Sequence, residues 1–192
     1  MQADFSQPSA LAQDSAGNIY VADANNYAIR KIDPAGIIAT IAGNGKQGNS
    51  PDGASAAGSP IYRPEALAIE PDGSLLFAEV YSSYRRVRRM GTDGKLATLA
   101  DSLLTSFVGG ALVSDGAGGF LYADSSARKI RRYSRETGAN DLAGSGDADS
   151  GGEIFARWLS LIQPDALALG SDGSIYVVDS RADRVYMLAP RW

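Results

Sequence analysis

The chemistry open to this chain is limited by two residue types that it lacks, since none of its 192 residues is histidine or cysteine. Their absence excludes imidazole acid–base catalysis, thiolate nucleophiles, disulfides and the common zinc and iron–sulfur sites. Carboxylate, hydroxyl, tyrosine, lysine and arginine chemistry remains. Four carboxylates recur after short apolar runs in similar surroundings: Asp23, Glu79, Asp124 and Asp179. An acid in this position typically accepts main-chain N–H groups of the following turn, so we interpret the four as structural and not as catalytic.

A second group of acids lies in the glycine-rich stretch GDADSGGE, residues 146–153. Asp147, Asp149 and Glu153 provide carboxylate oxygens of the kind that Ca²⁺ prefers, although their spacing is not that of an EF-hand loop. Asp and Gly are also common in any solvated loop. We therefore expect either no cofactor or calcium bound by these three acids.

Positive charge is concentrated in one part of a chain whose formal net charge is −4. Ten basic and four acidic residues lie between Arg85 and Arg135. Two similar runs, YRRVRRM and RKIRRY, contribute the main basic patch, which comprises Arg85, Arg86, Arg88, Arg89, Lys129, Arg131 and Arg132. Basic residues interleaved with tyrosines are typical of surfaces that bind single-stranded RNA. The alternative is that their stems cover a sheet and their charges pair with acidic neighbours.

The elements that position these residues follow from a pattern that occurs four times, beginning at Pro8, Pro64, Val108 and Pro164. Each copy consists of short apolar runs separated by Gly, Asp, Ser and Asn, which predicts strands and tight turns and not helices. In the first copy we expect strands at 10–12, 19–22, 28–32 and 37–42. Four antiparallel strands in about 40 to 50 residues is the size of a β-propeller blade.

The copies resemble NHL repeats through Pro8, the runs 10–12, 17–23 and 29–32, and their counterparts in the other copies. The resemblance implies an all-β β-propeller of four-stranded antiparallel blades over residues 1–192, with blades at 8–63, 64–107, 108–163 and 164–192. The last copy stops after its third strand, so the last blade lacks an outer strand of its own. NHL propellers most often have six blades.

Four copies leave three alternatives: a four-bladed ring closed by the N-terminal residues, a fragment of a longer propeller, or self-association of chains that completes a ring. Residues 1–7 match the segment before Pro64 and Pro164 better than a fourth strand. An open ring exposes a strand edge and an apolar blade face, and both favour a partner.

In such a blade, the loop between the second and third strands and the connection to the next blade lie on one rim. In repeat proteins, sites tend to occur where one copy differs, and the second copy has Glu79 in place of Asp and a two-residue insertion after it. Tyrosine, tryptophan and arginine bury a large area while they form hydrogen bonds. The predicted rim residues are Tyr27, Tyr62, Glu79, Tyr81, Tyr84, Arg128, Trp158 and Arg181.

Three functions follow. The first is a non-catalytic module whose rim binds a protein, a carbohydrate or another small molecule. The second is binding of RNA or another polyanion by the basic patch. The third, implied by the resemblance, is a calcium-dependent lactonase-like hydrolase, although the predicted innermost strands supply mostly Ala and Leu. Lyases of similar fold depend on histidine, which is absent.

The N-terminal residues show neither a signal peptide nor a membrane-spanning segment. We expect a soluble chain that does not contact membrane. The resemblance favours an extracytoplasmic location.

Overall fold

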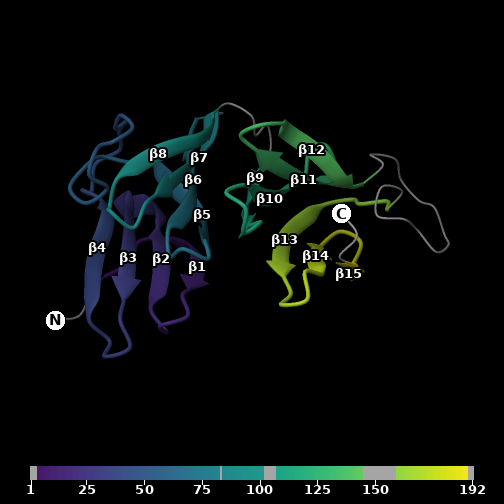
Figure 1. Ribbon diagram of the computed structural model, residues 1–192, viewed down its shortest axis with the longest axis horizontal. Coiled ribbons are helices and arrows are strands. Elements are labelled where there is room, and N and C mark those ends of the chain that lie inside the picture. The colour runs from purple at the N-terminus through teal and green to yellow at the C-terminus, as the bar shows by residue number, and fades with distance from the viewer. Residues whose placement is uncertain (1–3, 83, 102–106, 145–158, 190–192) are drawn as a thin grey trace. The chain divides into compact units, whose positions relative to one another are not determined.

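The computed structural model consists of short antiparallel strands joined by tight turns (Figure 1). It describes residues 4–82, 84–101, 107–144 and 159–189. These residues form four sheets, one for each sequence copy. The one helical element among the described residues is a 3-10 turn, η1 (Ala24–Asn26). The predicted all-β fold of antiparallel blades is confirmed. Within the described residues, no helix has the length and apolar character needed to cross a membrane.

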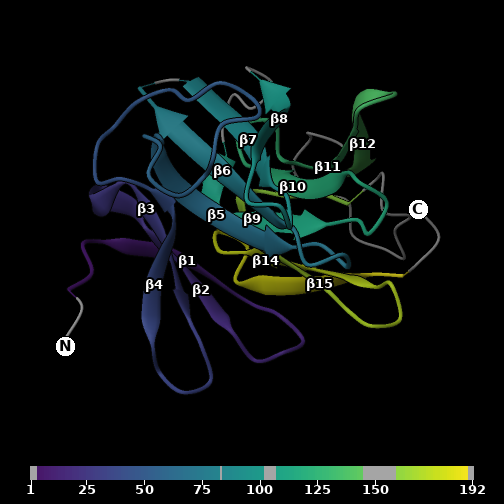
Figure 2. The same cartoon turned by 60° about the vertical axis from the view of Figure 1, so that its left-hand side comes forward.

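Two compact units make up the chain, Met1–Leu103 and Leu104–Trp192, and each contains two sheets. In every sheet the strands follow one another in sequence order, because each hairpin places the next strand beside the last (Figures 1 and 2). The first sheet contains β1 (Pro8–Gln13), β2 (Ile19–Asp23), β3 (Ala28–Ile32) and β4 (Ile38–Gly43). The second contains β5 (Arg63–Ile69), β6 (Leu75–Tyr81), β7 (Tyr84–Met90) and β8 (Leu96–Asp101).

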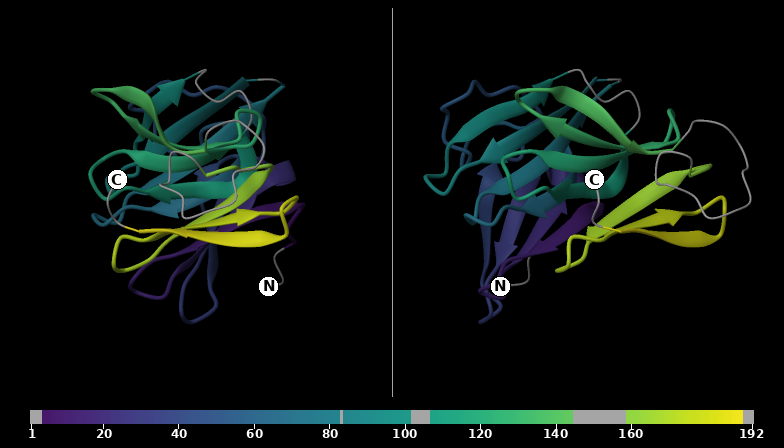
Figure 3. Two further views of the ribbon diagram at one scale, coloured as in Figure 1. Left: turned by 90° about the vertical axis from the view of Figure 1, so that its right-hand side faces the viewer. Right: turned by 45° about the vertical axis from the view of Figure 1, so that its right-hand side comes forward.

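In its described residues, the second unit repeats this plan with one strand fewer. Its first sheet contains β9 (Phe107–Ser114), β10 (Phe120–Asp124), β11 (Lys129–Ser134) and β12 (Gly138–Ala143). Its second sheet contains β13 (Pro164–Leu169), β14 (Ile175–Asp179) and β15 (Arg184–Leu188), which Figure 3 draws in yellow-green to yellow. Among the described residues this last sheet has three strands, in agreement with the prediction for the fourth copy.

The two sheets of the first unit pack through opposite faces. Side chains alternate between the two sides of a strand, so each sheet has two faces. We call the face of the second sheet that carries Leu67, Leu75 and Phe77 its leading face. The opposite side of the first sheet, its trailing face, carries Tyr20, Ala22 and Ile29. All six side chains are buried in one hydrophobic cluster.

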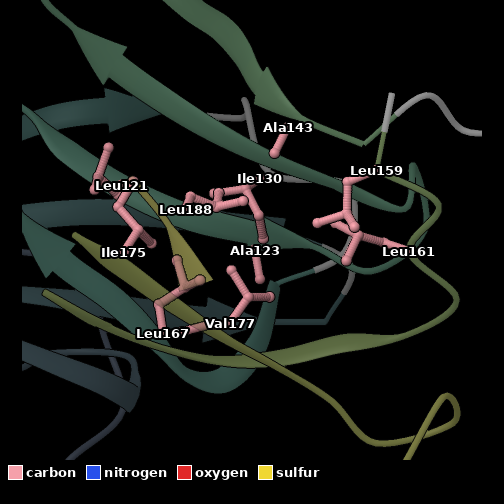
Figure 4. Packing of buried hydrophobic residues seen from close by; sticks show 11 residues of the cluster. Leu121, Ala123, Ile130, Ala143, Leu159, Leu161, Leu167, Ile175, Val177 and Leu188 are labelled. Carbon is pink, nitrogen blue, oxygen red and sulfur yellow. The ribbon is translucent and has the colours of Figure 1, made fainter. Parts of the chain in front are cut away.

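The second unit uses the same arrangement, as the close-up in Figure 4 shows. The trailing face of its first sheet contributes Leu121, Ala123 and Ile130, and the leading face of its second sheet contributes Leu167, Ile175 and Val177. These positions match the first unit in strand register, because Leu67 lies opposite Phe77 just as Leu167 lies opposite Val177. The same pairing of a leading with a trailing face therefore builds the core of each unit.

Two glycines are required by the turn before the third strand. Tyr27 and Arg128 occupy this turn with left-handed φ values of 46° and 56°. A Cβ on Gly43 would lie 2.1 Å from the main-chain oxygen of Tyr27, and one on Gly144 would lie 2.2 Å from that of Arg128. The close approach explains why a glycine follows the fourth strand's last alanine in the first and third copies.

Candidate binding site on the second blade

The repeated carboxylates are buried, and they accept hydrogen bonds from main-chain N–H groups and from arginine side chains. Asp23 is fully buried and accepts a hydrogen bond from the Ser6 N–H at 2.8 Å. Asp179, also fully buried, accepts from the N–H groups of Ile162 at 2.7 Å and Gln163 at 2.9 Å. Ser6 therefore occupies the position of the segment before β13, as the sequence comparison predicted for the N-terminal residues. The geometry is that of a structural acid, whose donors come from the preceding segment as well as from the following turn.

In the first and third copies an arginine on the third strand completes this arrangement. Arg30 lies opposite Val21 in the β2–β3 pair, and its Nε is 3.0 Å from the Asp23 carboxylate. In the third copy, Arg131 occupies the same register and binds Asp124 at 2.7 Å. The acid at the end of the second strand and this arginine thus form a repeated ion pair.

The second blade departs from that pattern. Glu79 is one methylene longer than Asp and binds Arg86, the residue directly opposite in the β6–β7 pair, at 2.5 Å. Both side chains are buried. Arg86 forms the ion pair with Glu79. Arg88, which lies in the register of Arg30 and Arg131, therefore binds a different partner.

Arg88 instead anchors the connection between β4 and β5. Its side chain has no exposed surface, and its guanidinium donates to the main-chain oxygen of Ser50 at 2.9 Å and to Asp52 at 3.2 Å. Asp52 in turn accepts from the main-chain N–H and the hydroxyl of Thr98 at 2.9 and 2.8 Å. Two strands of the second blade, β7 and β8, therefore hold one loop residue.

Main-chain bonds fix the same connection to the end of the blade. The Ala56 N–H donates to the Gly94 oxygen at 2.8 Å, and the Leu96 N–H donates to the Ala54 oxygen at 2.9 Å. Figure 2 shows this connection in blue, running from the first sheet to the second. The loop is thus a fixed part of the second blade, and it ends at Tyr62, just before β5.

Two tyrosine rings stack next to the buried Glu79–Arg86 ion pair. The rings of Tyr62 and Tyr81 stack with centroids 4.8 Å apart and planes 20° from parallel. The Arg86 guanidinium lies 5.1 Å from the Tyr62 ring centroid, within cation–π range, and donates to the Asn49 side-chain oxygen at 2.7 Å. Tyr81 remains 49% exposed. Its position depends on the insertion, which lengthens the hairpin so that Tyr81 pairs with Tyr84.

Burial dominates the electrostatics of this cluster. It raises the pKa of Glu79 above the usual range, although the charges of Arg86 and Arg88 and the Tyr62 N–H act in the opposite direction. Burial also lowers the pKa of Arg88, assisted by the charge of Arg86 and opposed by Glu79 and Asp52. The four groups form one coupled set in which two arginines share two carboxylates.

The structure thus brings together Tyr62, Glu79 and Tyr81 of the predicted rim. The Tyr84 backbone lies beside them, while its side chain is outside the described part. Tyr27 is half-buried in the first blade, and Arg128 and Arg181 are exposed in the second unit. Trp158 and the three acids of the predicted calcium loop, Asp147, Asp149 and Glu153, also lie outside the described residues. Among the residues that are described, no three acids cluster as a metal site would require. Calcium binding by the predicted loop stays a prediction, because that loop lies outside the described residues.

Most of the predicted basic patch pairs with acids in both units. Arg86 and Arg88 are buried with their partners, and Arg89 binds Glu70 and Asp72. In the second unit the pairs are Lys129 with Asp141, Arg131 with Asp124 and Asp141, and Arg132 with Asp115. Arg85 is half-buried. This geometry agrees with the alternative that the charges pair with acidic neighbours, and RNA binding stays a prediction.

Sequence reasoning missed Asn49, Ser50 and Asp52, which support the site from the loop. One signal was present: the second copy alone has arginine both opposite the acid and two residues later. Arg86 lies directly opposite the acid, so the second arginine indicated a further acceptor, which the connection between β4 and β5 provides.

Comparisons with known proteins agree with this fold. Residues 5–32 match the NHL repeat family. The protein SUPPRESSOR OF QUENCHING 1, chloroplastic, of Arabidopsis thaliana is 25% identical over 213 aligned residues, which cover 98% of this chain and 20% of that protein.

Many solved structures are similar in fold, and they include the following two. A chain from a nidogen/laminin complex has a TM-score of 0.66 at 19% identity, covering 95% of this chain and 60% of its own length. Virginiamycin B lyase from Staphylococcus aureus has a TM-score of 0.57 at 12% identity, covering 97% of this chain and 57% of its own length. The chain therefore spans a fifth of the curated relative and less than two thirds of these solved chains.

Proposed function

Because this chain is an NHL-repeat protein built of β-propeller blades, we propose that it is a non-catalytic module that binds a protein through the rim of its second blade. The observation that carries the proposal is the stack of Tyr62 on Tyr81. One ring comes from an inter-blade connection and the other from the hairpin between second and third strands. These are the two kinds of segment expected to form the rim.

The contacts that fix the Tyr62 ring favour recognition of a protein. Binding energy at protein interfaces is concentrated in a few residues, among which tyrosine and arginine are enriched. A ring that is fixed before binding loses little conformational entropy when a partner covers it. Arg86 fixes Tyr62 from one side and is itself fixed by Glu79 and Asn49. The site therefore presents an aromatic surface that is ordered in advance.

The acid nearest the stack is badly placed for catalysis. Glu79 has a raised pKa, which is a property of general acids in enzymes. However, its side chain has no exposed surface, and one carboxylate oxygen is bound to Arg86 at 2.5 Å. A group in this position cannot reach a substrate proton. Its chemistry supports a role in holding Arg86.

The similarity to the chain from a nidogen/laminin complex gives further support, since that structure contains a protein partner. We extend the class of partner to this chain and not its identity. The lyase of similar fold gives no comparable support, because this chain has no histidine.

A peptide library displayed on phage tests the proposal. Peptides selected on the purified chain should bind Tyr81→Ser about tenfold more weakly, because loss of a central aromatic contact typically costs more than 1 kcal/mol. Phe5→Ser is the matched control, since Phe5 is also an exposed aromatic residue, 38% exposed, and lies outside the site. Selected peptides that bind native chain and Tyr81→Ser equally would contradict the proposal, as would ester or lactone hydrolysis that copurifies with the protein.

A further inference from the structure

The side chain of Asn49 is held in one orientation beside the tyrosine stack. A guanidinium carries only hydrogen-bond donors, so the atom of Asn49 that binds Nη1 of Arg86 at 2.7 Å is the carbonyl oxygen. The amide nitrogen, Nδ2, therefore keeps two N–H donors, and it has no acceptor among the residues that the structure describes. Asn49 is exposed, so a partner can reach these donors.

Main-chain contacts place this amide next to Tyr62. The Gly48 N–H donates to the main-chain oxygen of Ile61 at 3.2 Å, and the two segments run parallel here. They are closely packed, because a Cβ on Gly48 would lie 2.9 Å from the Cβ of Pro60. Asn49 and Tyr62 are the next residues along the two segments, so they are neighbours. The donors of Asn49 are thus fixed in position before a partner binds.

The polar groups that adjoin the Tyr62 ring are donors. Arg86 can only donate, and the carboxylate that it binds, that of Glu79, has no exposed surface. With Nδ2 of Asn49, the site therefore combines aromatic surface with N–H groups that need acceptors. An ordinary peptide segment brings main-chain N–H groups of its own, which need acceptors as well.

A proline-containing segment matches this set of groups. Proline has no main-chain N–H, while its carbonyl can accept a hydrogen bond. In the polyproline II conformation the carbonyls have no internal partner, and the segment is extended before it binds, so little conformational entropy is lost. Grooves lined with aromatic residues bind such segments in several kinds of protein module.

We infer that the Tyr62–Tyr81 stack binds a proline-containing segment of a partner protein in the polyproline II conformation. A pyrrolidine ring packs on Tyr81, the more exposed of the two rings, and a main-chain carbonyl accepts a hydrogen bond from Nδ2 of Asn49. This binding mode rests on the proposed function, because it specifies what the same site recognises. Its residues all belong to the second sheet or to the connection before it, within the first compact unit.

Peptides selected from the phage library test this inference. Those that bind native chain more tightly than Tyr81→Ser should be enriched in proline relative to the unselected library. In a synthetic peptide of this kind, replacement of the proline by alanine should weaken binding to native chain about tenfold. The same replacement should change binding to Tyr81→Ser by less than about twofold, because the proline has already lost its contact there.

Asn49→Asp tests the hydrogen bond. The variant keeps an oxygen for Arg86 but exchanges the two N–H donors for a second oxygen, which repels a carbonyl, so the same peptides should bind about tenfold more weakly. Its melting temperature should not fall, because the contact with Arg86 is retained. Asn25→Asp is the matched control, since it makes the same change at an exposed position of η1 in the first blade and should leave peptide binding unchanged.

Three results would overturn the inference and leave the proposed function standing. These are Tyr81-dependent peptides without enrichment of proline; an effect of proline replacement that is equal on native chain and on Tyr81→Ser; and unchanged affinity of Asn49→Asp. Binding of oligosaccharides on a glycan array that is lost in Tyr81→Ser, with no Tyr81-dependent peptide, would overturn both, because the partner would then not be a protein.

Discussion

The guanidinium of Arg88 donates a hydrogen bond to the main-chain oxygen of Ser50 at 2.9 Å, and no part of the arginine side chain is exposed. A strand residue of the second blade thereby holds the long connection that ends at Tyr62. The corresponding arginines of the first and third copies bind acids of their own blade. In the second blade Arg86 binds the repeated acid, Glu79, and Arg88 binds the connection instead. The fixed position of Tyr62 therefore depends on a change of partner that the first and third copies do not show.

Asp52→Asn should weaken this anchor in a pH-dependent way. The variant keeps an oxygen for Thr98 but removes the charge opposite Arg88, so the free energy of unfolding at pH 7 should fall by about 1 kcal/mol, a small value because Asp52 is half exposed. Burial acts to raise the pKa of Asp52, but hydrogen bonds from Thr98 and the charge of Arg88 hold it below the ordinary 3.8. The contribution is therefore present above about pH 4 and lost as the pH falls through the lowered pKa.

Urea unfolding at pH 7, 4 and 2.5 measures this dependence. The difference between native chain and Asp52→Asn should shrink toward low pH, whereas Glu136→Gln, at an exposed position, should show no difference at any pH. A difference that stays constant over this range would mean that the Asp52 charge is not what anchors Arg88.

Glu79 and Arg86 should behave as a coupled buried pair. Removal of one partner leaves the other charge buried and uncompensated, so Glu79→Gln and Arg86→Met should each lower the free energy of unfolding by about 3 kcal/mol. The double variant should lose much less than the sum of the two, because no isolated charge remains. Additive losses in urea unfolding would show that the two side chains act independently.

The strands were predictable because their apolar runs and turn residues repeat four times. Strand order likewise predicted Tyr62 in the connection before β5 and Tyr81 at the end of β6. Their contact was not predictable, because it depends on how two residues inserted after Glu79 extend a hairpin. The partners of Arg86 and Arg88 were likewise not predictable. Both face one side of the strand, and only side-chain length and register decide which of them the acid reaches. A loop without periodicity offers no signal for Asp52.

A non-catalytic module of the kind proposed above needs no metal, so on that proposal calcium should leave the thermal stability of the chain unchanged. A ligand that binds only the native state raises the melting temperature in proportion to the logarithm of its excess over Kd. We expect melting curves in excess calcium and in chelator to coincide within about 1 °C. A rise with calcium that disappears in the variant Asp147→Asn with Asp149→Asn would assign a metal to the loop 146–153 and favour the lactonase-like alternative.

RNA should bind weakly or not at all. Most of the basic residues that would contact phosphates are engaged with carboxylates, as in the pairs of Lys129 with Asp141 and Arg132 with Asp115. Fluorescence anisotropy with mixed-sequence RNA at about 50 mM salt, where phosphate contacts are strongest, should give no saturable signal. Binding that falls steeply with added salt and is lost in Lys129→Glu with Arg132→Glu would establish the basic patch as a polyanion site.

Asp179 should stabilise the entry to the last sheet more than any surface acid does. Its buried carboxylate accepts from the N–H groups of Ile162 and Gln163, and from that of Ala182 at 3.2 Å. Asp179→Ala leaves the N–H groups of Ile162 and Gln163 without this acceptor, whereas that of Ala182 keeps the main-chain oxygen of residue 179. The loss should cost about 2–4 kcal/mol. Amide exchange at Ile162 and Gln163 should accelerate more than exchange elsewhere, because the segment before β13 has lost its anchor. Asp172→Asn, in the exposed turn between β13 and β14, should leave these two amides protected, and equal acceleration in both variants would mean that Asp179 holds no particular segment.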